Sequence, residues 1–540
     1  MGRADPGPHR SHGRGAMVRA RRCLVLVLAG CLQGLPAPAQ DSAPMSAIDW
    51  LSRSVLTPAA APWIQGGFPA PLPEPPVSSG AAIDPVLVTP LDRAGLNGLG
   101  LLPAARTGLP RDLWGLTPEP VLAQKLALDR VETLPAIQAF LLMLLVAEFD
   151  PPRIPDPEAR DLLFLARIDR LLALGALEPA LAMLDLAGAR SPEVFRRRFD
   201  VELLLGHEDR ACAIMGTAAG IAPSFPARIF CLARRGDWNA AALSLGTGRS
   251  LGHIDDEMSA LLERFLDPEL AEEEGDLPPP AHPSPLVFRM MEAIGQPMPT
   301  TALPVAFSQA DLRANTGWKA RIEAGERLAR MGVLDPNQLL GLYTERQAAA
   351  SGGVWARVTA VARLDQAIAA GDADAVAAAL PVAHAAMAAQ GLIPILSALY
   401  ARPLASLELE GAAGALAFRL GLLSEDYETL SRMRAPADAA EALLIALAQG
   451  RTAQVDAGDP LGQTLKEVFD TPVTAAPDPY RAILPDRLGE ALLAAIDDIT
   501  EGARGDYRRL GAGLRMLRFA GLETLARRSA LELVVLGARG

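Results

Sequence analysis

The sequence predicts an all-α protein: an α-solenoid of antiparallel helical hairpins in two blocks, preceded by an extended, proline-rich N-terminal arm. Half of the 540 residues are apolar and only 5% are aromatic, so alanine and leucine fill most apolar positions. These two residues are strong helix formers, whereas strands prefer β-branched and aromatic residues. In addition, a short glycine turn recurs about every 30 residues, a period typical of solenoids with two helices per unit.

Residues 1–39 have the anatomy of a secretory signal peptide. From Met17 onward, three arginines precede a ten-residue apolar run, 23–32, and the segment ends in Ala37-Pro38-Ala39, an A-x-A cleavage site. The run is too short to cross a bilayer, which needs roughly 20 apolar residues. The sequence therefore predicts export to the periplasm, with no transmembrane span in the mature chain.

A second interpretation of the same leader stays open. Leu28-Ala29-Gly30-Cys31 resembles a bacterial lipobox, in which the cysteine is acylated and becomes the mature N-terminus. Cleavage after Ala39 gives a periplasmic protein, whereas cleavage before Cys31 gives an outer-membrane lipoprotein with a lipid anchor.

Residues 40–116 are predicted to form an extended Pro/Gly-rich arm with one short helix over 46–56, because the prolines of 57–76 exclude regular helix and central strand. The arm also carries large apolar side chains that a solvated linker would not need. These residues, which we expect to dock on the helical body, are Trp50, Phe68, Leu101, Leu102, Leu113 and Trp114.

From residue 117 onward the chain is expected to be helical. Five helix starts share one pattern, a capping side chain followed by proline at the first helical position, where its missing N–H costs nothing. They are Thr117-Pro118, Asp156-Pro157, Ser191-Pro192, Asp267-Pro268 and Asp335-Pro336.

The repeat consists of a glycine that ends one helix and an alanine five residues later that packs the next. Gly175, Gly206 and Gly236 are 31 and 30 residues apart, a fourth turn of this type is expected at Gly371, and looser ones near Gly421 and Gly450. A glycine is expected at such helix ends because the backbone there is left-handed. The helical repeats of 117–273 and a second block, 305–540, are separated by a predicted Pro-rich linker, 274–304, with a helix over 286–294 inside it.

Cys212 and Cys231 are the only two cysteines beyond the leader, and we expect them to form a disulfide. An exported compartment is oxidising, the number is even, and the two positions fall on neighbouring predicted helices. The alternative is two buried thiols that never meet.

Several chemistries find no support in the sequence. The net charge is −12, and because residues 1–39 hold six Arg and one Asp and so carry +5, the remaining chain carries −17, which argues against nucleic acid as a partner. His207, His253, His282 and His384 are scattered without metal-ligand spacing, and no nucleotide motif is present. We therefore expect no metal, no cofactor and no catalytic residues.

One apparent catalytic motif is interpreted as a turn. Gly248-Arg249-Ser250-Leu251-Gly252 matches G-x-S-x-G, but that motif exposes its serine only where a strand turns sharply into a helix. An alanine- and leucine-rich predicted helix precedes it here, so a glycine-rich turn between repeats is favoured.

The units around Gly175, Gly206 and Gly236 resemble tetratricopeptide-type helical hairpins, above all in 232–241, Leu-Ala-Arg-Arg-Gly-Asp-Trp-Asn-Ala-Ala. The resemblance covers about 100 residues well; the period is shorter than the family's 34, and most of the family's aromatic positions are missing. The whole chain also resembles uncharacterised exported proteins of GC-rich Gram-negative bacteria, a likeness that implies no activity.

The resulting functional expectation is a non-enzymatic periplasmic scaffold or adaptor that binds an envelope protein, since solenoids present extended concave surfaces. The alternative is a cell-wall (peptidoglycan) enzyme, or its accessory subunit, related to lytic transglycosylases with a helical superhelix. This chain resembles that superhelix in class only and lacks the glutamate signature of the appended catalytic domain.

Overall fold

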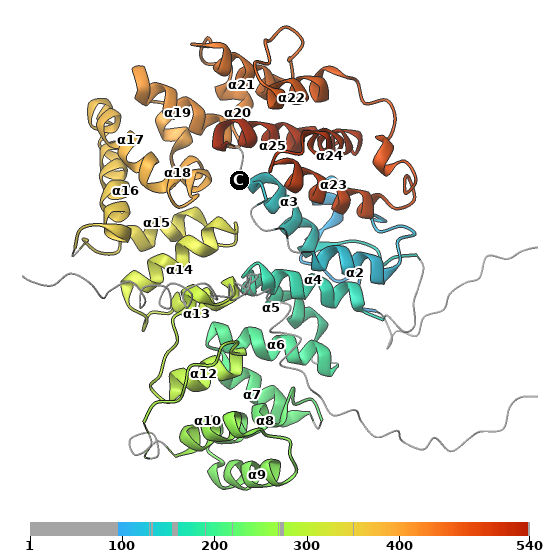
Figure 1. Cartoon of the computed structure of the whole chain (residues 1–540), viewed down its shortest axis with the longest axis vertical. Helices are drawn as coiled ribbons and strands as arrows, with labels where there is room; N and C mark the ends of the chain where they lie inside the picture. The colour runs from blue at the N-terminus through green and yellow to red at the C-terminus, as the bar shows by residue number, and fades with distance from the viewer. Residues whose placement is uncertain are drawn as a thin grey trace, which may run out of the picture. The chain divides into compact units, whose positions relative to one another are not determined.

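The computed structural model describes residues 95–537 apart from 129, 131–132, 154–159, 189–190, 219, 268, 270–274 and 349, and this part of the chain forms 23 α-helices (Figure 1). In chain order they are α2 Glu119–Ala127, α3 Pro135–Val146, α4 Leu162–Ala173, α5 Leu177–Ala187, α6 Pro192–Leu205, α7 Glu208–Thr217, α8 Phe225–Arg234, α9 Trp238–Ser250, α10 Asp256–Leu266, α12 Pro285–Ala293, α13 Ser308–Asp311, α14 Trp318–Arg330, α15 Pro336–Thr344, α16 Gly353–Ala370, α17 Ala373–Ala388, α18 Ile393–Ala405, α19 Gly411–Leu423, α20 Tyr427–Leu430, α21 Ala439–Gln449, α22 Pro460–Asp470, α23 Leu488–Gly502, α24 Tyr507–Phe519 and α25 Glu523–Leu536.

Little else in the described part is regular. Two strands of two residues each, β1 (Leu102–Pro103) and β2 (Ala147–Glu148), pair in parallel. Four short 3₁₀ helices complete the elements: η2 Ala104–Arg106, η3 Thr300–Ala302, η4 Val305–Phe307 and η5 Asp478–Tyr480. The all-α prediction is confirmed.

Side-chain caps start many of these helices. Ser191 Oγ accepts from Val194 N at 3.3 Å at the start of α6, and Asp335 Oδ1 accepts from Asn337 N at 2.8 Å at the start of α15, as predicted. Each cap satisfies one of the backbone donors that a helix leaves unpaired at its first turn. Further caps of the same kind are Ser224, Asp237, Asp255, Ser284, Asp372, Asp438, Asp459 and Asp506.

One predicted cap is wrong by a residue. Helix α2 begins at Glu119 with Pro118 as its N-cap, and no side chain caps it. The hydroxyl of Thr117 is buried and makes no hydrogen bond among the described atoms. The caps predicted at Asp156-Pro157 and Asp267-Pro268 involve residues outside the described part.

The predicted turn glycines have the expected backbone. Gly175, Gly206, Gly236 and Gly371 have φ between 67° and 83°, where a Cβ would be strained. In each case the following helix starts two residues later, so the chain reverses within a few residues. Gly450 ends α21 in the same way, with φ 65°.

The turn expected near Gly421 is wrong. Gly421 lies inside α19, and the helix continues to Leu423. A Cβ at this position would meet Leu430 Cδ1 at 2.9 Å, so the glycine serves close packing against α20 rather than a change of chain direction.

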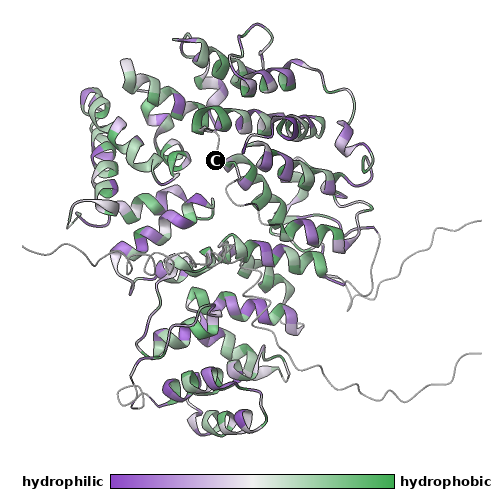
Figure 2. Ribbon diagram, in the orientation of Figure 1, coloured by the Kyte–Doolittle hydropathy of each residue, from purple (hydrophilic) through white to green (hydrophobic). Residues whose placement is uncertain are grey.

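Helices adjacent in the sequence pack against one another through most of the described part. Contacts join each successive pair from α3 to α10 and from α13 to α19, and again from α23 to α25. Figure 2 shows hydrophobic residues gathered where these helices face their neighbours. This pairing of neighbours is the packing expected of helical hairpins.

Helices far apart in the sequence also meet, because α25 packs against α3 and α2 packs against α23. The carboxylate of Glu532 in α25 accepts from Ala136 N at 2.9 and 3.0 Å, at the start of α3, where a helix dipole favours negative charge. The hydroxyls of Thr133 and Thr500 lie 2.7 Å apart nearby. These buried contacts tie the beginning of the helical region to its end.

An apolar stretch of the sequence, 139–146, forms most of α3, which is green along most of its length in Figure 2. Its buried residues include Ile137, Leu141, Leu144 and Leu145. In the described part of the chain, no helix is both long and apolar enough to cross a membrane.

The last part of the predicted arm packs on the helices. Leu113 and Trp114 are each 1% exposed, whereas Leu101 is 40% exposed. Gly115 approaches the backbone of Asp486 so closely that a Cβ would overlap Asp486 O. Trp50 and Phe68 lie outside the described residues, and so does the predicted helix over 46–56.

The helix expected within 286–294 is confirmed as α12, Pro285–Ala293. Phe288 of this helix meets Phe307 of η4 edge-on at 5.2 Å, and both belong to a core cluster that also contains residues of α3–α6 and α23–α25. The rest of the described residues from 275 to 304 are mostly non-helical. The division into two helical blocks at 274–304 stays a prediction.

Candidate functional site

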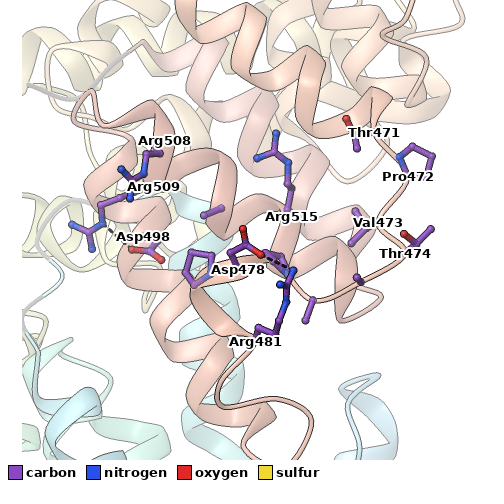
Figure 3. A pocket seen from close by; sticks show the side chains of 15 residues that line it. Thr471, Pro472, Val473, Thr474, Asp478, Arg481, Asp498, Arg508, Arg509 and Arg515 are labelled. Atoms are coloured by element: carbon purple, nitrogen blue, oxygen red, sulfur yellow. Dashed lines mark hydrogen bonds and ion pairs between the residues drawn. The ribbon is translucent and has the colours of Figure 1, made fainter.

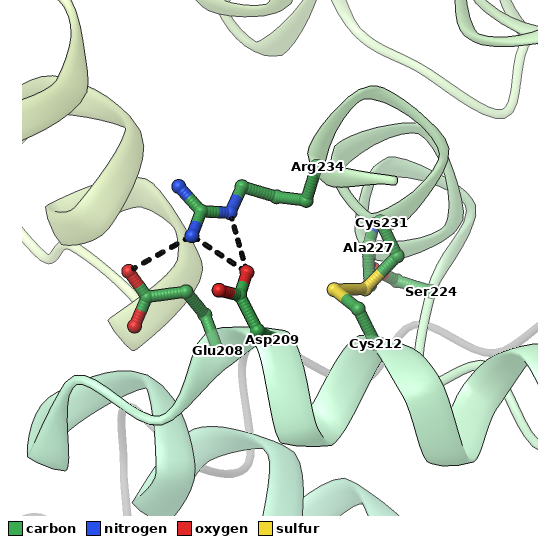
Figure 4. The surroundings of a disulfide bond; sticks show 7 residues. All are labelled: Glu208, Asp209, Cys212, Ser224, Ala227, Cys231 and Arg234. Carbon is green, nitrogen blue, oxygen red and sulfur yellow. Dashed lines mark hydrogen bonds and ion pairs between the residues drawn. A yellow bond between two sulfur atoms is a disulfide. The ribbon is translucent and has the colours of Figure 1, made fainter. Parts of the chain in front are cut away.

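The predicted disulfide between Cys212 and Cys231 is present and joins α7 to α8 (Figure 4). Both residues are buried, and their Cα atoms lie 5.0 Å apart. On the neighbouring turn, Arg234 donates to Asp209 Oδ1 from both Nε, at 3.0 Å, and Nη2, at 2.6 Å. The bridge is thus a structural link in a hairpin. Cys31, the predicted alternative lipidation site, lies outside the described residues.

The G-x-S-x-G sequence has the geometry of a helix end. Ser250 is the last residue of α9, and its hydroxyl donates to Gly246 O at 2.9 Å, a bond within the helix. Gly252 then adopts φ 71° and turns the chain. A strand-to-helix elbow does not occur at this serine.

A pocket between the loop that follows α22 and helices α23 and α24 is named here the arginine recess (Figure 3). Its volume is about 680 Å³, and one wall is the loop from Thr471 to Pro479 between α22 and α23. The opposite wall consists of side chains from α23 and α24. They are Asp498, Arg508, Arg509, Ala512 and Arg515, with Arg481 at the end of the loop.

Glycines place α24 against α23 and so position its outer face. A Cβ on Gly502 would meet the backbone of Leu510 at 2.6 Å, and one on Gly513 would meet Ala495 O at 2.9 Å. The two helices therefore approach closely on this side. Arg508, Ala512 and Arg515, at i, i+4 and i+7, share one face of the helix and line the recess.

The two acids of the recess are already paired. Asp498 accepts from Tyr480 Oη at 2.6 Å and from Arg509 Nε at 2.8 Å, and Asp478 pairs with Arg481 at 2.5 Å. Burial, together with the hydrogen bond to Asp498, raises the pKa of Tyr480 well above its usual range, so its hydroxyl stays a donor. These pairs hold the side chains of the two walls in place and do not involve Arg508 or Arg515.

Arg508 and Arg515 are the two arginines of the recess that form no close ion pair. Arg508 is exposed and has no ion-pair partner among the described residues, while Arg515 reaches only the exposed Glu467, at 3.7 Å. Helix α24 carries four arginines and no acid, in a chain of net charge −12. These arginines were not predicted from the sequence as site residues. The available signal was the acid-free run 507–519 with arginines at helical spacing.

A second hollow, named here the alanine hollow, lies on α16 and α17 and has a volume of about 500 Å³. Ala360, Ala367, Ala370, Ala375, Ala378, Ala379 and Val382 form most of its lining, and Arg363, Gln366 and Asp372 complete it. Val382 is 59% exposed. Small side chains on both helices leave a shallow apolar depression that a protein segment can fill.

Charged side chains also gather inside the hairpins around α6. Arg197 donates to both oxygens of Asp169 at 2.6 Å, and Arg198 donates to Asp185 at 2.6 Å and to Glu202 at 3.0 Å. The pairs with Asp169 and Asp185 join α6 to α4 and α5, whereas the pair with Glu202 lies within α6. Asp200, also on α6, is 5% exposed, and its Oδ2 has no hydrogen-bond partner in the described part.

Burial raises the pKa of Asp200 to about 7, although Arg196 and Arg197 lower it. The unfolded carboxyl titrates near pH 3.9, so between about pH 4 and 7 the folded state binds more protons than the unfolded state. The contribution of Asp200 to stability therefore falls as the pH rises through this window.

We expect Asp200→Asn, which cannot ionise, to stabilise the protein at pH 8 relative to the native chain. The difference in the free energy of unfolding between variant and native chain is expected to grow by on the order of 2–4 kcal/mol from pH 4 to pH 8. Urea unfolding across this pH range measures it, and an equal difference at pH 4 and pH 8 would contradict the assignment.

Among the described residues, no group of three or more His, Cys, Asp or Glu side chains is placed to hold a metal ion. Comparisons with protein-family models, with curated proteins and with solved structures found no match to this chain. The two hollows therefore have to be interpreted from their own residues.

Proposed function

We propose that this protein is an exported helical-repeat scaffold that binds an envelope protein, with hairpins like those of tetratricopeptide-type solenoids. The observation that carries the proposal is the series of neighbouring helix pairs that reverse at left-handed glycines, at Gly175, Gly206, Gly236 and Gly371. Stacked hairpins of this kind present extended surfaces to partners and seldom carry catalysis themselves.

Two further features support the proposal. The Cys212–Cys231 disulfide fits the oxidising compartment that the leader predicts. The alanine hollow offers an apolar surface of the type into which an amphipathic partner helix packs. We assign the main contact with the partner to this hollow.

The test is crosslinking in living cells with a C-terminal tag, followed by identification of what co-purifies from the envelope fraction. We expect one abundant protein partner, and we expect Ala378→Glu to lower its recovery at least about fivefold, because a charge in an apolar contact is costly to desolvate. Ala378 is exposed, so the substitution leaves the folded chain intact.

Ala213→Glu, at an exposed position of α7, is the matched control and should leave recovery unchanged. Recovery with cell-wall fragments and without a protein partner would overturn the scaffold and favour the alternative of a cell-wall enzyme or its accessory subunit. Equal recovery with both variants would instead move the contact away from the alanine hollow.

A further inference from the structure

The arginine recess has three properties that point to a ligand. It is hollow, with about 680 Å³ between a loop and two helices. It contains four arginines against two aspartates, and each aspartate is already paired with one of the arginines. The guanidinium groups of Arg508 and Arg515 therefore remain able to bind an anionic ligand, in a protein whose overall charge is negative.

The opposite wall offers hydrogen-bond donors. In the described part, the backbone N–H groups of Val473, Thr474, Ala475 and Ala476 donate to no backbone carbonyl. These residues line the recess and are exposed or half-buried. A ligand with both carboxylates and backbone carbonyls would satisfy the two walls together.

The spacing of the arginines fits an extended chain. Arg508 and Arg515 are seven residues apart on a helix, which separates their Cα atoms by about 10 Å along the axis. In a polyproline II segment, residues three apart point to the same side and are separated by about 9 Å. Two acidic side chains at i and i+3 of such a segment match this pair.

We propose that the arginine recess binds an extended acidic peptide segment of the protein partner. Arg508 and Arg515 pair with its carboxylates, and the backbone donors of 473–476 bind its carbonyl groups. This inference rests on the proposed function, which makes the partner a protein. It adds an electrostatic binding site separate from the alanine hollow. Charge contacts of this type raise the association rate and set the register of the bound segment.

The probe is a labelled twelve-residue peptide of glycine, proline and serine with two aspartates three residues apart, titrated with the purified chain and followed by fluorescence anisotropy. We expect it to bind at least about tenfold more tightly than the same peptide with asparagines, and to weaken as salt rises. We expect Arg508→Gln with Arg515→Gln to lower its affinity about tenfold.

The control double variant is Arg346→Gln with Arg402→Gln, which removes the same charge from exposed side chains outside the recess lining. It should bind the aspartate peptide within about twofold of the native chain, since charges away from the contact are largely screened. An unchanged thermal midpoint shows that a variant is folded. We expect this of the double variant at 508 and 515, because Arg508 is unpaired and Arg515 makes only the 3.7 Å contact.

The proposal would be overturned if the native chain bound the aspartate and asparagine peptides equally well. It would also be overturned if the double variant at 508 and 515, called the recess variant, bound the aspartate peptide as tightly as the native chain. Displacement of the peptide by inorganic phosphate or pyrophosphate, at concentrations near the dissociation constant of the peptide, would also overturn the proposal. The recess would then be a site for small anions. An envelope partner that still crosslinks undiminished to the recess variant would overturn this inference alone, whereas the absence of any protein partner would overturn the proposed function.

Discussion

Replacing Arg167 with methionine is expected to lower the free energy of unfolding by roughly 3–5 kcal/mol. Arg167 is 1% exposed, and its guanidinium donates to four backbone carbonyls. Nε donates to Leu145 O at 2.8 Å, Nη2 to Ala147 O at 2.7 Å, and Nη1 to Leu99 O at 2.7 Å and Asn97 O at 3.2 Å. Methionine fills the space but leaves all four acceptors without this donor.

The position of the acceptors explains the size of the effect. Leu145 and Ala147 lie at the C-terminal end of α3, where the helix dipole favours a cation, and residues 97–99 belong to the segment that leads into β1. Burial lowers the pKa of Arg167 to about 10, so the group still carries its charge at neutral pH. One side chain therefore joins α4 to the end of α3 and to the first described segment.

Chemical denaturation followed by circular dichroism measures the loss. Arg167→Lys retains the charge but has one nitrogen in place of three, so it should recover only part of the stability. Arg111→Met is the matched control, because Arg111 is 72% exposed in its pair with Asp150, and its loss should cost less than about 1 kcal/mol. A methionine variant at 167 as stable as the native chain would contradict this account.

Arg167 also illustrates what a single sequence can and cannot predict. The helices, the caps at Ser191 and Asp335, and the turn glycines follow from local chemistry, because each depends on residues within one turn of helix. The acceptors of Arg167 lie 20 to 70 residues away, and no local pattern indicates them. Gly421 was misinterpreted for the same reason, since only its contact with Leu430 distinguishes a packing glycine from a turn glycine.

The candidate sites divide in the same way. The Cys212–Cys231 bridge was predictable, because two cysteines beyond the leader leave only one pairing within the folded chain. The arginine recess was not, because its second wall, the loop 471–479, is brought to α24 by the fold. The acid-free composition of 507–519 was visible, but composition alone does not place a hollow beside it.

Removing the disulfide with Cys212→Ala and Cys231→Ala is expected to destabilise one part of the molecule by about 3 kcal/mol. The bridge joins two residues that are 19 positions apart in the sequence and so restricts the unfolded chain. Both cysteines are buried. The loss should be local, because the cysteines belong to a core cluster formed by side chains from 195 to 291, whereas α23–α25 pack in a different cluster.

Hydrogen exchange measures this directly. In the double variant, backbone amides of α7 and α8 should exchange on the order of a hundredfold faster, since 3 kcal/mol corresponds to about two powers of ten in the opening equilibrium. Amides of α23–α25 should be unaffected. A reducing agent should reproduce the effect in the native chain and have none on the variant. Uniform acceleration throughout the chain would show instead that the two clusters unfold together, and that the hairpin of α7 and α8 supports the whole array.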